Sequence, residues 1–159
     1  MNKAKLIEAF ITQLETDIHA LEQNIKETKE EATHEESKPE NEYDTRALET
    51  GYLVKAQSKR ILDAKEALAA FKNVPAKSFQ PTDPIQATAL IHLDMDGKKL
   101  WFLFMPSGGG HSLQFEGRKI QIITSASPLG EALLGQISGS FVSIENGDDV
   151  KEIEILSVS

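Results

Sequence analysis

Hydrophobic positions in the first half of the chain recur at alternating spacings of four and three residues. The first run comprises Ile7, Ile11, Leu14, Ile18, Leu21, Ile25 and Thr28. The second comprises Tyr43, Ala47, Thr50, Val54, Gln57, Ile61, Ala64, Leu68 and Phe71. Residues spaced in this way lie on one face of an α-helix, and two such seams are typical of a coiled coil. Because only a short break separates them, they predict an antiparallel hairpin of two helices, each roughly 30 residues and ~45 Å long.

The seam residues become smaller and more polar toward the break. Large side chains such as Leu6, Phe10 and Phe71 lie near the base of the predicted hairpin, whereas Thr28 and Thr50 lie near its far end. We therefore expect a base that is anchored by packing and a slimmer, more weakly packed far end.

The break itself, near residues 35–43, forms an acidic tip. Pro39 suits the first turn of a helix and not its interior, and Ser37 could cap the second helix, with Glu40 completing a capping box. Between residues 27 and 44 there are eight carboxylates and two lysines, a net charge of −6 in a chain of −8. Such a run is usually a solvated turn. However, the acids that end the first helix lie where the helix dipole disfavours anions, which favours a tip that binds a cation.

The second half of the chain has a different period. Residues 75–84 contain three prolines and no regular pattern, which predicts a linker between a hairpin at 1–74 and a C-terminal domain at 85–159. Beyond the linker, apolar and polar residues alternate in short segments with turn residues between them. The expected strands cover 85–93, 99–105, 112–115, 119–124, 139–144 and 150–158, with turns at 94–97 and 146–149 and a flexible loop at 107–111.

One short helix is predicted at 127–135, with Ser127 as its N-cap, Pro128 in its first turn and Gly135 as its left-handed end. The segment 99–105 is apolar on both faces and should be a central strand. The second half is thus predicted to be a small antiparallel α+β domain of five or six strands and one short helix.

Composition narrows the classes of function. The chain contains no cysteine, which excludes disulfides and thiolate chemistry and fits a cytoplasmic protein. No signal peptide is recognisable at the start, and no apolar run reaches the ~20 residues of a membrane span. The acidic balance argues against tight direct binding to nucleic acid and favours a basic protein surface or a metal ion as the partner.

These motifs, in this order, resemble the bacterial Gre-family transcription elongation factors, which promote transcript cleavage (GreA/GreB-like). The pair Glu42-Tyr43, followed by Gly51-Tyr52, looks like the family's Glu-Tyr and Gly-Phe motifs. The segment 127–135, Ser-Pro-Leu-Gly-Glu-Ala-Leu-Leu-Gly, looks like its C-domain signature, and 152–158 looks like its final strand. The resemblance covers nearly the whole chain.

The resemblance implies an FKBP-like C-terminal domain that docks on RNA polymerase, with Ser127, Pro128 and Leu129 as docking residues. The coiled coil would enter the secondary channel, where Glu36 and Glu40 would help to hold a second Mg²⁺ shared with the polymerase. The polymerase's own active centre would then cleave backtracked RNA. The chain would therefore be a monomeric accessory factor without catalysis or a cofactor of its own, in indirect contact with nascent RNA and away from membranes.

The tip departs from the family pattern, which reads Asp-x-x-Glu-Asn-x-Glu-Tyr. Alignment on Tyr43 places Glu36 at the Asp position and Pro39 at the first Glu, whereas alignment on Glu40-Asn41 requires a one-residue deletion. The alternative is therefore a Gre-like factor that occupies the channel and modulates or inhibits transcription without efficient cleavage. A third hypothesis is a coiled-coil adaptor that binds through the exposed residues Leu48, Leu53 and Leu62.

Overall fold

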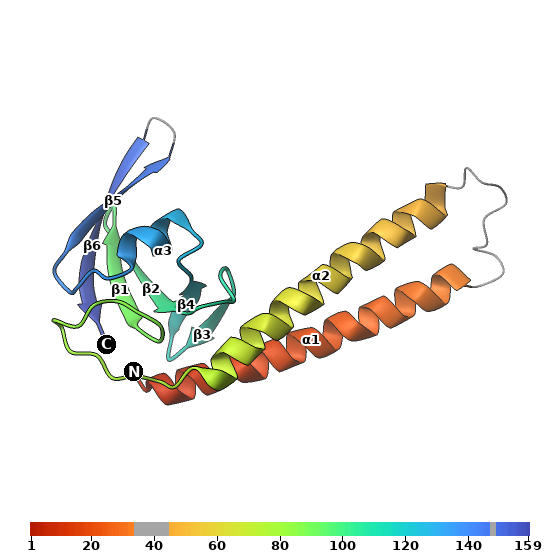
Figure 1. Ribbon diagram of the computed structural model, residues 1–159, viewed down its shortest axis with the longest axis horizontal. Coiled ribbons are helices and arrows are strands. Elements are labelled where there is room, and N and C mark those ends of the chain that lie inside the picture. Colours follow the sequence, from red (N-terminus) through yellow and green to blue (C-terminus); the bar gives the residue numbers. More distant parts are fainter. Residues whose placement is uncertain (34–44, 147–148) are drawn as a thin grey trace.

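The computed structural model describes residues 1–33, 45–146 and 149–159. Within these ranges a long helical hairpin projects from a sheet that carries one short helix (Figure 1). The hairpin consists of α1 (Lys3–Thr33) and α2 (Thr45–Asn73), as predicted. The chain starts at the base of the hairpin, beside the sheet, and the outer ends of both helices lie far from it (Figure 1).

The seam between the helices weakens with distance from the base, as the sequence predicts. Ile7, Leu14 and Ile18 of α1 are buried, whereas Leu21 and Ile25 farther out are only half-buried. On α2 the buried seam residues are Ala64 and Phe71, whereas Ala47, at the outer end of the predicted seam, is exposed. The outer part of the hairpin is therefore held by less apolar packing than its base.

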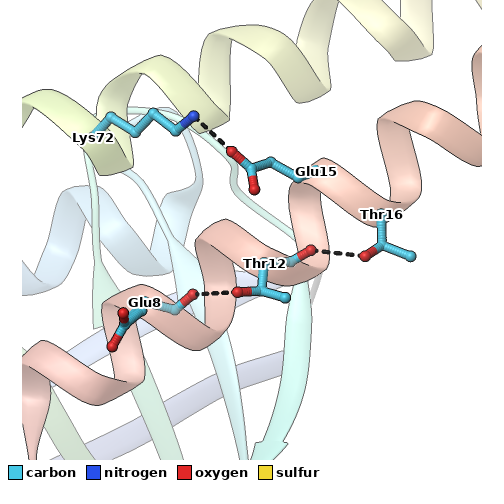
Figure 2. A network of polar contacts seen from close by, with 5 residues as sticks. All are labelled: Glu8, Thr12, Glu15, Thr16 and Lys72. Atoms are coloured by element: carbon cyan, nitrogen blue, oxygen red, sulfur yellow. Dashed lines mark hydrogen bonds and ion pairs between the residues drawn. The ribbon is translucent and has the colours of Figure 1, made fainter.

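Charged pairs connect the helices along their exposed side. The ammonium of Lys72 lies 2.6 Å from the carboxylate of Glu15 (Figure 2). A second pair joins Lys65 and Glu22 at 2.7 Å. Exposed pairs of this kind each contribute up to about 1 kcal/mol, so their main effect is on the register of the two helices rather than on stability.

The sheet has six strands in the order β3-β4-β2-β1-β6-β5. Neighbouring strands are antiparallel except β2 and β4, which are parallel. The sheet is thus mostly antiparallel, as predicted. The parallel pair, which was not predicted, arises because β4 lies between β2 and β3, which are consecutive in the sequence. The elements are β1 (Leu90–Met95), β2 (Lys98–Phe104), β3 (Ser112–Phe115), β4 (Arg118–Ile123), α3 (Pro128–Leu133), β5 (Phe141–Asn146) and β6 (Asp149–Val158).

The first strand is shorter than its alternating pattern predicts. Thr88 has a φ of 72°, a left-handed conformation that is rare for a β-branched residue, so the strand begins only at Leu90. The turn after it is also tighter than expected and consists of Asp96 and Gly97, both with positive φ, which suits a two-residue hairpin. The centre of the predicted turn at 146–149 lies outside the described residues.

Each face of the sheet has its own buried cluster. Phe102 and Phe104 of β2 face the first cluster, which α3 covers through Leu133. Leu103, between them, faces the second cluster. The second cluster also contains residues from the base of the hairpin, namely Leu6, Ile7, Phe10, Leu14, Ala67 and Phe71. The strand predicted to be central is therefore buried on both faces, and the hairpin base forms part of the core of the sheet.

Segment 74–89 is tied to both parts of the structure. The ammonium of Lys3 in α1 donates to the carbonyl of Lys77 at 2.6 Å and lies 4.5 Å from the ring centroid of Phe79. Partial burial lowers the pKa of Lys3 to about 8. The backbone N–H of Lys77 also donates to the hydroxyl of Thr88 at 3.0 Å. These contacts fix the path of the segment between the hairpin and the sheet.

The loop that follows β2, predicted to be a flexible connection, packs closely against α2. A Cβ atom at Gly108 would lie 3.0 Å from the Cβ of Ala67, and Gly108 has a φ of 88°. Glycine therefore satisfies both the backbone conformation and the close approach at this position.

Candidate functional site

The acidic residues predicted to form a metal site, Glu36 and Glu40, lie outside the described residues. The described part of the hairpin ends at Thr33 on one helix and resumes at Thr45 on the other (Figure 1). Both ends lie at the extremity of the molecule that is farthest from the sheet (Figure 1). At 1.5 Å per residue, the 31 residues of α1 extend for about 46 Å. The predicted acids thus belong to the stretch of sequence between the outer ends of α1 and α2.

Carboxylates also lie on the last turns of α1, which lead to this segment. Glu27, Glu30 and Glu31 lie in the last turns of α1 and are exposed. Glu30 lies 3.9 Å from the ammonium of Lys26. These acids are positioned at a helix C-terminus, where the dipole raises the free energy of an anion. Helix stability therefore does not account for these three acids, although Lys26 and Lys29 lie in the same turns and offset part of their charge.

Carboxylate oxygens suit Mg²⁺, which binds one or two such groups while it keeps several water molecules. Within residues 1–33, 45–146 and 149–159, no group of three or more histidine, aspartate or glutamate side chains is placed to hold a metal ion. A shared Mg²⁺ site at Glu36 and Glu40 remains a prediction from the sequence.

The predicted docking residues form the start of α3. The hydroxyl of Ser127 accepts from the backbone N–H of Gly130 at 3.1 Å and donates to the carbonyl of Thr124 at 3.1 Å. Ser127 is thus the N-cap that the sequence predicts. Pro128 is exposed, whereas Leu129 is half-buried against the first cluster. Among the three residues, Pro128 is the one with most of its surface available to a partner.

The position of α3 depends on a close backbone contact. A Cβ atom at Gly130 would lie 1.9 Å from the carbonyl oxygen of Thr124, so no side chain fits at this position without displacement. Two large apolar residues that follow the helix, Leu134 and Ile137, are 47% and 40% exposed. The start and end of α3 therefore offer a partly apolar surface on a rigidly placed helix.

The structure also brings together basic residues that the sequence interpretation did not single out. A cavity of about 380 Å³ is lined by Lys99, Leu100, Trp101, Phe102, Gly117, Arg118, Lys119 and Gln121. The sequence signal was the presence of adjacent basic pairs at 98–99 and 118–119. Their meeting depends on the parallel pairing of β2 with β4, which the strand pattern did not predict.

The described helices include none that is both long and apolar enough to cross a membrane. No protein-family model matches the chain, and no curated protein matches it.

Several solved structures are similar to the chain. Gfh1 of Thermus aquaticus is 17% identical over 95% of this chain and 94% of its own, with a TM-score of 0.38. GreA factor homolog 1 (Gfh1) of Thermus thermophilus is 18% identical over 96% and 94%, with a TM-score of 0.36. The prokaryotic transcription elongation factor GreA/GreB from Nitrosomonas europaea is 14% identical over 70% and 92%, also at 0.36. At these identities and TM-scores the likeness carries no information about activity.

Proposed function

We propose that this chain is an accessory transcription factor that binds bacterial RNA polymerase and inserts its helical hairpin into the secondary channel. In this proposal the acidic tip, with Glu36 and Glu40, promotes cleavage of backtracked RNA by the polymerase's own active centre. The sheet domain docks outside the channel through Ser127, Pro128 and Leu129.

The observation that carries the proposal is the anchoring of the hairpin. Phe10 and Phe71 are both buried in the cluster that fills one face of the sheet. The part of α1 beyond Leu14, its outermost buried residue in this cluster, runs to Thr33, so a projection held in this way can transmit the position of a docked sheet over roughly 28 Å at 1.5 Å per residue. Combined with the acidic sequence of the tip, this arrangement suits delivery of carboxylates into a narrow channel.

The proposed chemistry at the tip is electrostatic. One or two carboxylates can retain a mobile Mg²⁺ next to a metal that the polymerase already holds, and paired metals stabilise the attacking and leaving oxygens of phosphodiester hydrolysis. Glu36 and Glu40 are the proposed ligands, and the metal would be shared with the polymerase.

The experiment is RNA cleavage in a backtracked elongation complex, with the wild type beside Glu36→Gln/Glu40→Gln. Cleavage that depends on the two carboxylates is expected, with polymerase binding unchanged in the variant. The matched control is Glu8→Gln/Glu49→Gln, which removes the same charge from exposed positions that lie on α1 and α2. Equal cleavage by wild type and tip variant would contradict the proposed role of the tip.

A second candidate function is occupation of the channel without efficient cleavage. It is favoured by the tip sequence, in which Pro39 occupies the position of the family's first Glu when Tyr43 is aligned. Metal geometry tolerates little displacement of its ligands. Wild-type protein that produces no cleavage but inhibits a genuine cleavage factor in the same assay would establish this alternative.

A coiled-coil adaptor remains the third hypothesis. Leu48, Leu53 and Leu62 on α2 are exposed, together with Tyr52 at 71%. Sedimentation of the full chain distinguishes this hypothesis, because an adaptor that associates through α2 should be a stable oligomer, whereas a channel factor should be a monomer. A chain that neither cleaves nor competes, and that forms an oligomer, would replace the polymerase proposal.

A further inference from the structure

Basic side chains gather at one edge of the sheet. β2 begins with Lys98-Lys99 and β4 begins with Arg118-Lys119. The two strands are parallel, with Trp101 opposite Ile120, so both basic pairs lie at the same edge. If this register is followed two residues toward the start of both strands, Lys99 lies beside Arg118. A chain with a net charge of −8 thus carries a local concentration of positive charge.

The wall of the cavity at this edge contains cations, and Asp94 of β1 lies directly opposite one of them, Lys99. Lys99, Arg118 and Lys119 contribute to its wall, and no aspartate or glutamate does. Within the described part of the chain, none of these three side chains lies within ion-pair distance of a carboxylate. Unpaired charges around a concave surface focus the field and attract ions of the opposite sign.

One of these cations is held in place by aromatic contacts. The guanidinium carbon of Arg118 lies 4.9 Å from the ring centroid of Trp101. The indole in turn stacks on His92, with 4.2 Å between ring centroids and 10° between planes. A guanidinium that stacks on a ring keeps its N–H edge free, and that edge matches the oxygens of a phosphate in a bidentate arrangement.

We propose that Lys99 and Arg118 form a binding site for the phosphate groups of a nucleotide or of a single nucleic-acid strand. Lys99 and Arg118 lie on the face of the sheet that carries Trp101, whereas Lys119, the next residue of β4, points to the opposite face. Two neighbouring cations suit a multiply charged oxyanion better than a single carboxylate. The volume of about 380 Å³ exceeds the needs of one phosphate and lies in the range of pockets for small molecules. This inference is independent of the proposed transcription function.

His92 provides a spectroscopic reporter for the pocket. Burial lowers its pKa, and so do the charges of Lys99 on β2 and Arg118 on β4, whereas Asp94 on β1 raises it. Its neighbour on β6, Ser157, carries no charge. A phosphate bound to Lys99 and Arg118 would offset their positive charge and raise the pKa of His92.

The test is an NMR titration of the full chain with inorganic pyrophosphate, with a nucleoside triphosphate and with a single-stranded RNA of about 12 nucleotides. Shifts are expected at the amides of 99–102 and 117–121, together with a rise in the pKa of His92. Lys99→Gln/Arg118→Gln should weaken binding about tenfold or more, because it removes two charge-assisted contacts. The matched control, Lys98→Gln, removes a neighbouring charge that does not line the cavity and should change the affinity less than about twofold.

The three probes distinguish the source of the phosphate. Binding of pyrophosphate and the triphosphate without the RNA would assign a nucleotide site, and binding of the RNA would assign a strand backbone. The proposal is overturned if the pocket amides do not shift, or if Lys98→Gln weakens binding as much as the pocket variant does. It is also overturned if poly-glutamate alone produces the shifts, since the partner would then be an acidic protein segment. The titration contains no polymerase, so a failure to bind phosphate would leave the transcription proposal unaffected.

Discussion

The rings of Phe10 and Phe71 meet with 5.3 Å between centroids and 39° between planes, where both helices enter the core of the sheet. Both side chains are almost fully buried, at 1% and 2% exposure. Tilted aromatic pairs at this distance add to the free energy gained from burial alone. The pair therefore links the two helices to each other within the cluster that they share with the sheet.

Replacement of one of these rings should destabilise the whole protein. Phe71→Ala removes a large buried side chain and should lower the free energy of unfolding by about 3–5 kcal/mol. Leu62→Ala on the same helix is the control, because Leu62 is 69% exposed and should change stability by less than about 0.5 kcal/mol. Urea unfolding measures the free energy of unfolding of both variants. Equal stabilities of the two variants would contradict the anchoring of the hairpin.

Two glycines should respond in opposite ways to alanine. Gly130→Ala forces a Cβ atom onto the carbonyl of Thr124 and should destabilise the protein or displace α3. Gly51→Ala, within α2, meets nothing within 4 Å and should stabilise by up to about 1 kcal/mol through helix propensity. Thermal unfolding of both variants checks the pair, and tolerance of alanine at Gly130 would show that this contact is not required.

The cap of α3 can be separated from its proposed docking role. Ser127→Ala removes the hydroxyl that accepts from Gly130 and should cost about 1 kcal/mol in stability. Ser127→Asn keeps a capping oxygen and should restore most of that loss. If polymerase binding is lost in both variants while stability returns in the second, the serine has a role in docking beyond the cap.

Stability should decline as the pH falls through the range in which His92 titrates. Its pKa is lowered in the folded protein, mainly by burial, so the unfolded chain binds the proton more tightly. The free energy of unfolding therefore rises with pH from the folded pKa up to the unfolded value of about 6.5, and this contribution is constant above it. His92→Gln should remove that part of the slope. An unchanged slope between wild type and variant, measured by urea unfolding at several pH values, would contradict this assignment.

The sheet should depend on the hairpin for its own stability. A chain that starts at residue 75 would expose the cluster residues that the hairpin base covers, including Leu103 and Ile120, both 0% exposed in the full chain. We expect this fragment to be less stable than the full chain and to bind a hydrophobic dye. Unfolding of the fragment at the same denaturant concentration as the full chain would instead support two independent domains, as the linker sequence predicts.

Local patterns in the sequence predicted most of the elements. The spacing of Ile7, Leu14 and Ile18 predicted the helical seam, because positions on one helix face follow directly from the helical period. The cap at Ser127 and the left-handed Gly135 were also predicted, since each depends only on neighbouring residues. These features are local, and local chemistry is sufficient to predict them.

Features that depend on distant contacts were not predicted. The alternation at 85–93 has the period of a strand, but Thr88 donates its N–H to the carbonyl of Phe104 and adopts a positive φ, which delays the start of β1. The parallel pairing of β2 with β4 arises from the insertion of one strand between two that are consecutive in the chain. The basic pocket depends on that insertion, so the basic pairs at 98–99 and 118–119 are visible in the sequence but their meeting is not. The predicted tip residues, Glu36 and Glu40, lie outside the described residues.

The cluster shared by the hairpin base and the sheet has a consequence for synthesis on the ribosome. Leu6 and Phe10 are synthesised more than 100 residues before Ile120 and Ile122, which share their cluster. The outer seam can pair as soon as α2 has been made, while the apolar base must wait for β4. Until then it presents exposed hydrophobic surface of the kind that molecular chaperones bind. Completion of the sheet thus buries this hydrophobic surface of the nascent hairpin.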